Sequence, residues 1–122
     1  MDFVGAIKNG FRNYANAAGR APRSEFWYWT LFSFLVAAAG AVIDMAIFGV
    51  ENERGLFGPL LSLALLIPDV AVSIRRLHDL DRKWAWLLIY FTGIGAIVLL
   101  VWFCMKGTGG PNRFGPDPLA RP

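Results

Sequence analysis

The chain has 122 residues, of which 56% are hydrophobic, and a formal net charge of +3 at pH 7. This hydrophobic content exceeds the roughly 45–50% of soluble domains, and it is gathered in long blocks typical of membrane proteins. The length predicts one domain, and the modest charge without an interleaved basic and aromatic groove argues against a nucleic-acid partner. The single cysteine, Cys104, lies inside an apolar block, so it can form no intramolecular disulfide and no metal site by itself.

The N-terminal segment, residues 2–16, has an amphipathic pattern. Phe3, Ile7, Phe11 and Tyr14 recur at helical spacing, and polar residues occupy the opposite side. A helix of this length is too short to cross a bilayer. We therefore expect a helix that lies in the membrane interface, or one that packs on the other helices of the same chain.

The first predicted span covers residues 26–48, after a break at Gly19 and Pro22. A helix over this range is roughly 34 Å long, enough for a hydrocarbon core of about 30 Å. Glu25 comes just before it, where a helix dipole favours a carboxylate. Small residues at 37–41 predict a surface on which another helix could pack closely.

The second predicted span covers residues 56–74, and Pro68 is expected to kink it. The third covers residues 84–105, again about the length that a span needs. The tail, residues 106–122, is rich in Gly and Pro and too polar for lipid, so we expect an irregular segment outside the bilayer. The sequence therefore predicts an all-α membrane protein with three transmembrane helices and an N-terminal amphipathic interfacial helix.

The distribution of basic residues predicts the orientation of the chain in the membrane. With three spans, more of them flank the N-terminus and the loop at 75–83 than the opposite face, which puts the N-terminus in the cytoplasm. In an alternative arrangement, residues 92–95 form a turn, the third segment is re-entrant and the tail joins the cytoplasmic side. Its two halves would be only about 8 and 10 residues long, and non-helical backbone that faces lipid is very costly.

Two acidic residues, Asp44 and Asp69, fall inside predicted spans and are functional candidates for that reason. Asp44 is expected near the outer interface, where water can solvate it. Asp69 is expected to pair with an arginine from the cytoplasmic side, namely Arg20, Arg23 or Arg76. Such a buried pair would fix how the N-terminal segment docks, and a binding or relay role is the alternative.

The stretch at 73–83 carries the densest charge in the chain and includes His78, the single histidine. One imidazole with two neighbouring aspartates lacks convincing metal-ligand spacing. No nucleophile with a base and no phosphate-binding glycine loop can be assembled, so we expect no enzyme, no metal and no cofactor. Arg75 and Arg76 could hold lipid phosphates, or could simply extend to the membrane interface.

Three blocks carry a family resemblance. They are Gly19-Arg-Ala-Pro-Arg-Ser-Glu-Phe-Trp27, Ile74-Arg-Arg-Leu-His-Asp79 and Gly107-Thr-Gly-Gly-Pro-Asn-Arg-Phe-Gly-Pro-Asp-Pro118. Their order and spacing resemble the domain of unknown function 805 (DUF805) family of small bacterial inner-membrane proteins, over nearly the whole chain. The resemblance implies a multi-span inner-membrane protein and assigns no activity.

The chain departs from this family after the second block. Where the family usually reads Thr-Gly-Arg-Ser-Gly-Trp-Trp, this chain reads Leu80-Asp-Arg-Lys-Trp-Ala-Trp86. We expect Asp81 to adopt the turn conformation that glycine would have taken.

The predicted topology brings the polar blocks together at the cytoplasmic face, and the tail joins them only in the re-entrant arrangement. The candidate site residues are Arg20, Arg23, Glu25, Asp69, Arg75, Arg76, His78 and Asp79. We expect a non-catalytic protein that serves as an accessory or stabilising subunit of a larger membrane complex, or as a small oligomer. The alternative is a protein whose Arg/His/Asp cluster binds lipid head groups, such as those of anionic phospholipid, or a small anion.

Overall fold

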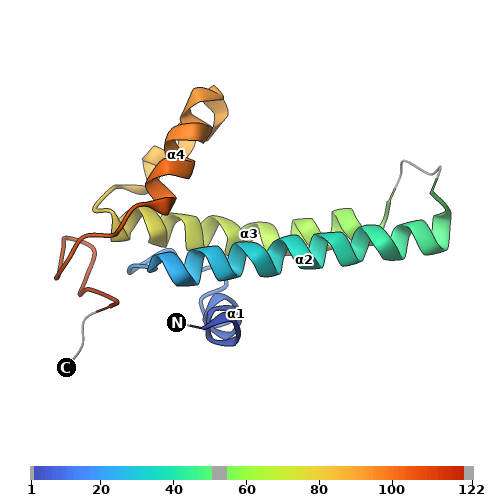
Figure 1. Cartoon of the computed structure of the whole chain (residues 1–122), viewed down its shortest axis with the longest axis horizontal. Coiled ribbons are helices and arrows are strands. Elements are labelled where there is room, and N and C mark those ends of the chain that lie inside the picture. The colour runs from blue at the N-terminus through green and yellow to red at the C-terminus, as the bar shows by residue number, and fades with distance from the viewer. Residues whose placement is uncertain (1, 51–54, 120–122) are drawn as a thin grey trace.

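The computed structural model describes residues 2–50 and 55–119. This part of the chain is all-α, as predicted. It contains α1 (Phe3–Arg12), α2 (Arg23–Phe48), α3 (Phe57–Asp79), the 3₁₀ helix η1 (Trp84–Thr92) and α4 (Ile94–Cys104). The helices α2 and α3 lie side by side and antiparallel along the long axis of the molecule (Figure 1). Both are long and apolar enough to cross a membrane, which agrees with the first two predicted spans.

The helices α2 and α3 approach each other most closely at two glycines. A Cβ atom on Gly40 would lie 2.8 Å from the Cα atom of Gly58, a separation that only glycine tolerates. The small residues predicted to receive another helix therefore include one that packs against α3 of the same chain.

Asp44 caps the start of α3 from the neighbouring helix. Its carboxylate accepts hydrogen bonds from the backbone N–H groups of Leu56, Phe57 and Gly58 at 2.9, 2.8 and 2.9 Å. The first N–H groups of a helix have no partner within the helix, so this carboxylate supplies three acceptors that α3 lacks. The residue is only 8% exposed, so the expectation that water solvates Asp44 is wrong.

The prediction that residues 84–105 form a single transmembrane helix is wrong. The chain instead forms η1, turns at Gly93 with a φ of 78°, and returns as α4. The turn is tight, since a Cβ atom on Gly95 would lie 1.8 Å from the carbonyl oxygen of Ile89. Glycine is needed at both positions, at the first for its left-handed backbone and at the second for the close approach. The structure thus contains the turn at 92–95 that the alternative arrangement required.

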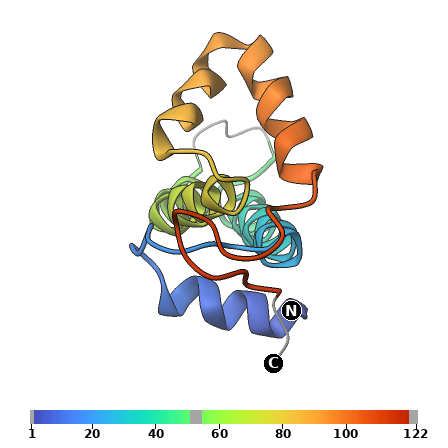
Figure 2. The ribbon, with the colours of Figure 1, turned by 90° about the vertical axis from the view of Figure 1, so that its left-hand side faces the viewer.

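The hairpin of η1 and α4 projects from one side of the α2/α3 pair, and α1 crosses the other side (Figure 2). Close contact between α1 and α2 depends on Gly10, where a Cβ atom would lie 2.2 Å from the ring of Trp29. Phe11 makes edge-on contacts with Trp29 and Phe32, at ring-centroid distances of 5.3 and 5.7 Å. Of the two expectations for the N-terminal helix, packing on the other helices is observed, although Phe11 remains 48% exposed.

The largest buried apolar side chains lie where α2 begins and α3 ends, and this end of the pair is here called the charged end. Trp29, Val72, Leu77 and Phe103 belong to its core. The helix α3 continues through Pro68 and ends at Asp79, beyond the predicted end at residue 74. The loop that follows contains Asp81 at a φ of 59°, which confirms its predicted glycine-like turn conformation.

Candidate functional site

The centre of the charged end is Asp79, the last residue of α3. Its Oδ1 accepts a hydrogen bond from Nε of Arg20 at 3.0 Å, and its Oδ2 accepts one from Nη1 of Arg76 at 2.5 Å. All three side chains are buried. One carboxylate therefore binds two guanidinium groups away from solvent, which leaves one positive charge to be stabilised in another way.

The tail supplies that stabilisation through its backbone carbonyls. Arg20 donates to the carbonyl of Thr108, to that of Gly110 at 2.7 Å and to that of Gly115 at 3.3 Å. Arg76 donates to the carbonyl of Met105. Carbonyl dipoles that point at a cation stabilise it without adding a second buried charge. The tail thus joins the polar cluster, as expected for the re-entrant arrangement.

The fit between the tail and Asp79 also requires close approach of the backbone. The N–H of Thr108 donates to the carbonyl of Asp79 at 2.7 Å. A Cβ atom on Gly107 would lie 1.9 Å from Oδ2 of Asp79. Only glycine fits at this position, which gives the first glycine of the third sequence block a packing role.

A separate buried ion pair joins the second half of α1 and the start of α2 to α3. Glu25 accepts a hydrogen bond from Arg75 at 2.6 Å and one from the side-chain amide of Asn9 at 2.5 Å. The carbonyl of Arg75 accepts from the N–H of Ala21 at 3.0 Å. Within the described residues, Nε and Nη2 of Arg75 have no hydrogen-bond partner. This pair holds α1 and the segment before α2 against α3.

His78 joins the segment before α2 to the tail. Its Nδ1 lies 2.9 Å from the carbonyl oxygen of Gly19, which can only accept, so this nitrogen carries the proton. Its ring stacks on Phe114 of the tail, with ring centroids 4.0 Å apart and planes 2° from parallel. Asn112 donates to the carbonyl of His78 at 2.9 Å. The imidazole therefore acts here as a flat packing surface and a single donor.

Asp69 lies apart from this cluster. It is ten residues before Asp79, which corresponds to about 15 Å along the helix. Its Oδ1 accepts from Nε1 of Trp29 at 2.7 Å, and its Oδ2 accepts from the hydroxyl of Ser33 at 3.1 Å. The prediction that Asp69 pairs with an arginine is therefore wrong. An indole and a hydroxyl of α2 take that role, and both are uncharged donors that sequence reasoning did not consider.

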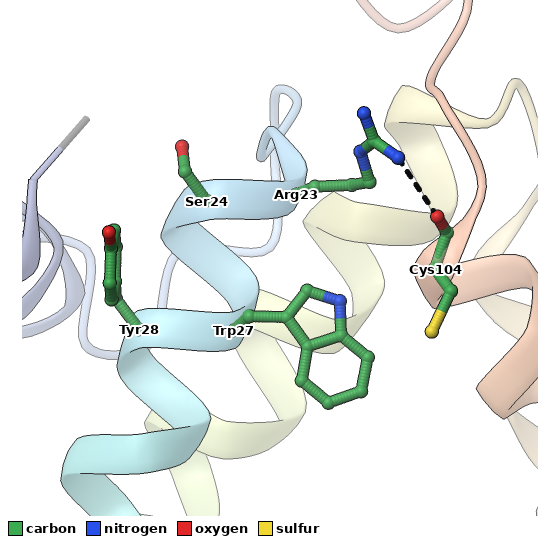
Figure 3. Close-up of a pocket in the computed structure, with 5 residues that line it drawn as sticks. All are labelled: Arg23, Ser24, Trp27, Tyr28 and Cys104. Atoms are coloured by element: carbon green, nitrogen blue, oxygen red, sulfur yellow. Dashed lines mark hydrogen bonds between the residues drawn. The ribbon is translucent and has the colours of Figure 1, made fainter.

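Arg23 lies at the edge of the charged end and remains exposed. It donates to the carbonyl of Cys104 at 3.1 Å, which ties the start of α2 to the end of α4. A shallow pocket opens beside it (Figure 3). The pocket is lined by Arg23, Ser24, Trp27, Tyr28 and Cys104.

Seven of the eight predicted site residues thus meet at one end of the molecule, and Asp69 does not. Sequence reasoning missed the tail carbonyls, which have no side-chain signature, although the conspicuous glycines of the third block marked the segment. It also missed Asn9 and Phe114, which look like ordinary residues of a polar helix face and a loop. The described residues contain no group of three or more His, Cys, Asp or Glu side chains that could hold a metal ion.

A sequence model described as "Protein of unknown function (DUF805)" matches residues 14–116. The chain belongs to the DUF805 family. The matched range contains both partners of each buried ion pair and the tail carbonyls that bind Arg20. The network at the charged end is therefore made by the part of the chain that defines its membership of the DUF805 family.

Two relatives from Escherichia coli K12 are similar over almost their whole length. The chain is 46% identical to "Inner membrane protein YhaI" over 108 residues, which cover 88% of this chain and 89% of the relative. It is 35% identical to "Inner membrane protein YhaH" over 113 residues, which cover 91% and 93%. No solved structure matches the chain. With two helices suited to crossing a membrane, this DUF805 chain is an inner membrane protein.

Proposed function

We propose that this DUF805 protein is non-catalytic and acts through packing, as an accessory or stabilising subunit of a larger membrane complex or as a small oligomer. The support is that its charged side chains are largely used internally. Arg20, Arg76 and Asp79 bind one another and the tail, and Glu25 binds Arg75. These groups hold the fold together, and the surface left for other molecules is mainly apolar.

The observation that carries this proposal is the exposed tip of the η1/α4 hairpin. Phe91 is 82% exposed and Ile94 is 77% exposed, and the whole hairpin is apolar on every side. Such a helix is normally buried in lipid or against another protein. A projecting hairpin offers a partner helix two faces of large apolar side chains.

The proposed orientation has the charged end in the cytoplasm. Of the 12 Lys and Arg residues, Arg54 and Arg121 lie outside the described part of the chain. The other ten belong to α1, to the segment between α1 and α2, to α2 and α3 at the charged end, to the loop after α3 and to the tail. This asymmetry is stronger than the one expected for three spans, and an excess of basic residues marks the cytoplasmic side.

Purification from native membranes in mild detergent, followed by native mass spectrometry, tests the packing role. We expect the wild-type chain to carry a second copy or another membrane protein in fixed stoichiometry. The double change Phe91→Ala and Ile94→Ala should release that partner, because it removes the large side chains at the hairpin tip. The matched control is Val42→Ala on α2, which is 63% exposed and far from the hairpin. A monodisperse wild-type monomer without any partner protein would contradict the proposal.

The pocket beside Arg23 favours a second candidate function, the binding of a lipid phosphate. Arg23 is exposed, the unpaired N–H groups at the start of α2 lie next to it, and Trp27 and Tyr28 form an apolar wall suited to an acyl chain (Figure 3). A helix start and a guanidinium both favour a phosphate. Arg75 and Arg76, which the sequence suggested for this role, are buried and engaged with Glu25 and Asp79.

Quantifying the phospholipid that co-purifies with the chain tests this candidate. We expect anionic phospholipid to be retained by the wild type and lost in Arg23→Gln. The control is Arg12→Gln, which removes an exposed positive charge from α1 and leaves the pocket intact. Equal loss in both variants would mean that only overall charge matters and would contradict a specific site.

A further inference from the structure

Two open cavities share Asp69, a half-buried residue about midway along α3. One, of about 360 Å³, lies between α2 and α3, and the other, of about 560 Å³, lies between α3 and η1. Asp69 and Ser73 line both. These volumes fall within the range of about 300–1,000 Å³ that is usual for small-molecule sites. The walls are apolar and include Phe26, Trp29 and Phe34 of α2.

The polar groups that face this space have already used their hydrogen-bond donors. Trp29 and Ser33 both donate to the carboxylate of Asp69. The hydroxyl of Ser73 donates to the carbonyl of Asp69 at 2.8 Å, and that of Thr30 donates to the carbonyl of Phe26 at 2.8 Å. The hydroxyl oxygens keep free lone pairs. Two of the about four acceptor sites of the carboxylate also remain. What the cavities present to a ligand is therefore a set of acceptors.

No cation of the described residues compensates Asp69. The ion pairs in this part of the chain involve Glu25, Asp79 and Asp81 as the acidic partners. A carboxylate in a predicted span without a basic partner is a functional candidate. The group that would suit it best carries a positive charge and several N–H donors and has no need of an acceptor.

We propose that the two cavities together bind one amphiphile with a protonated amine head and an apolar tail. The ammonium group would donate to Asp69 and to the hydroxyl oxygens of Thr30 and Ser73, and three N–H donors suffice for these acceptors. The aromatic walls favour a cation as well. The tail would leave between α3 and η1, where Leu88 and Phe91 are exposed and the cavity is largest. This inference does not depend on the proposed packing role.

Binding of three amphiphiles with the same alkyl tail tests the proposal. The purified chain in phosphatidylcholine nanodiscs is titrated with dodecylamine, dodecanol or dodecanoate, and bound amphiphile is counted by native mass spectrometry. We expect saturable binding of dodecylamine at one site, weaker binding of dodecanol and none of dodecanoate. Asp69→Asn, which is nearly isosteric, should weaken dodecylamine binding by about tenfold or more, since it removes a charge-assisted hydrogen bond.

A pair of variants that leaves Asp69 intact separates the cavity from the fold. Ala37 lines the cavity between α2 and α3, so Ala37→Leu should fill it and reduce binding. Ala38→Leu adds the same side chain on an exposed face of α2 and should bind as the wild type does. Thermal unfolding of each variant checks that it is folded.

Three results would overturn the assignment. They are a wild type that does not bind dodecylamine, a folded Asp69→Asn that binds it equally well, and equal binding of all three head groups. If instead a protein partner co-purifies with the wild type and is lost from Asp69→Asn, while dodecylamine does not bind, the cavity accepts a basic side chain of that partner and the amphiphile proposal fails.

Discussion

Asp79 shows how a buried positive charge is stabilised by backbone rather than by a second acid. Its carboxylate lies within 3.0 Å of both Arg20 and Arg76, so the three groups together keep one excess positive charge. The carbonyls of Thr108 and Gly110 point at Arg20 and disperse that charge. Removing the carboxylate would leave two guanidinium groups buried and repelling each other.

We expect Asp79→Asn to lower the free energy of unfolding by about 3–5 kcal/mol, as breaking a buried ion pair commonly does. Chemical unfolding in detergent, followed by circular dichroism, measures this change. The matched control is Asp81→Asn, two residues later, whose partner Arg113 is half exposed. An exposed pair contributes at most about 1 kcal/mol, so the control should change little. Similar losses in the two variants would argue against the buried network.

At the scale of the helices, the η1/α4 hairpin sets the architecture apart from a simple three-span bundle. A largely apolar run of 22 residues, from 84 to 105, has the length and hydropathy of a span. Hydropathy does not distinguish one long helix from two short ones. The distinguishing signal was Gly93 with Gly95, because the first permits a left-handed backbone and the second permits close contact with Ile89.

Gly95→Ala should therefore destabilise the hairpin by about 1–3 kcal/mol, the usual cost of overpacking. Its Cβ would collide with the carbonyl of Ile89. Gly109→Ala is the matched control, because among the described residues no atom beyond its two chain neighbours lies within 4 Å of the added Cβ. Hydrogen exchange of η1 and α4 amides in detergent reports the effect. Exchange that is unchanged in Gly95→Ala would contradict the tight turn.

The elements that could be predicted are those fixed by local composition. The helices α2 and α3 follow from length and hydropathy, and Asp81 from its tolerance of a left-handed turn. The meeting of Arg20 with Asp79 followed from topology once two sequence blocks were assigned to one face. The partners of Asp69 could not be predicted, because a single sequence does not say which residue of α2 faces it across the helix pair.

At the scale of the whole molecule, the hairpin determines the side on which the tail lies. Because α4 ends beside the start of α2, the tail returns to the end where α3 stops (Figure 1). A continuous third span would instead carry the tail to the opposite face. The hairpin therefore places Lys83 and Arg113 on the same face of the membrane, whereas a continuous third span places them on opposite faces.

Cysteine labelling decides between them. In a Cys104→Ser background, Lys83→Cys and Arg113→Cys should both be protected from an impermeant maleimide in spheroplasts and labelled in inverted vesicles. Val50→Cys, which is exposed beyond the far end of α2, should show the reverse pattern. Opposite labelling of the first two positions would show that the third segment crosses the bilayer and would refute the hairpin.

The dependence of Arg20 on the tail carbonyls also imposes an order on biogenesis. Residues 108–115 are synthesised after Arg20 and Asp79, so the guanidinium group of Arg20 gains these carbonyl acceptors last. Until translation reaches the tail, the charged end lacks these acceptors. We therefore expect a chain truncated before residue 108 to be less stable than the full chain, because Arg20 would be buried without these acceptors.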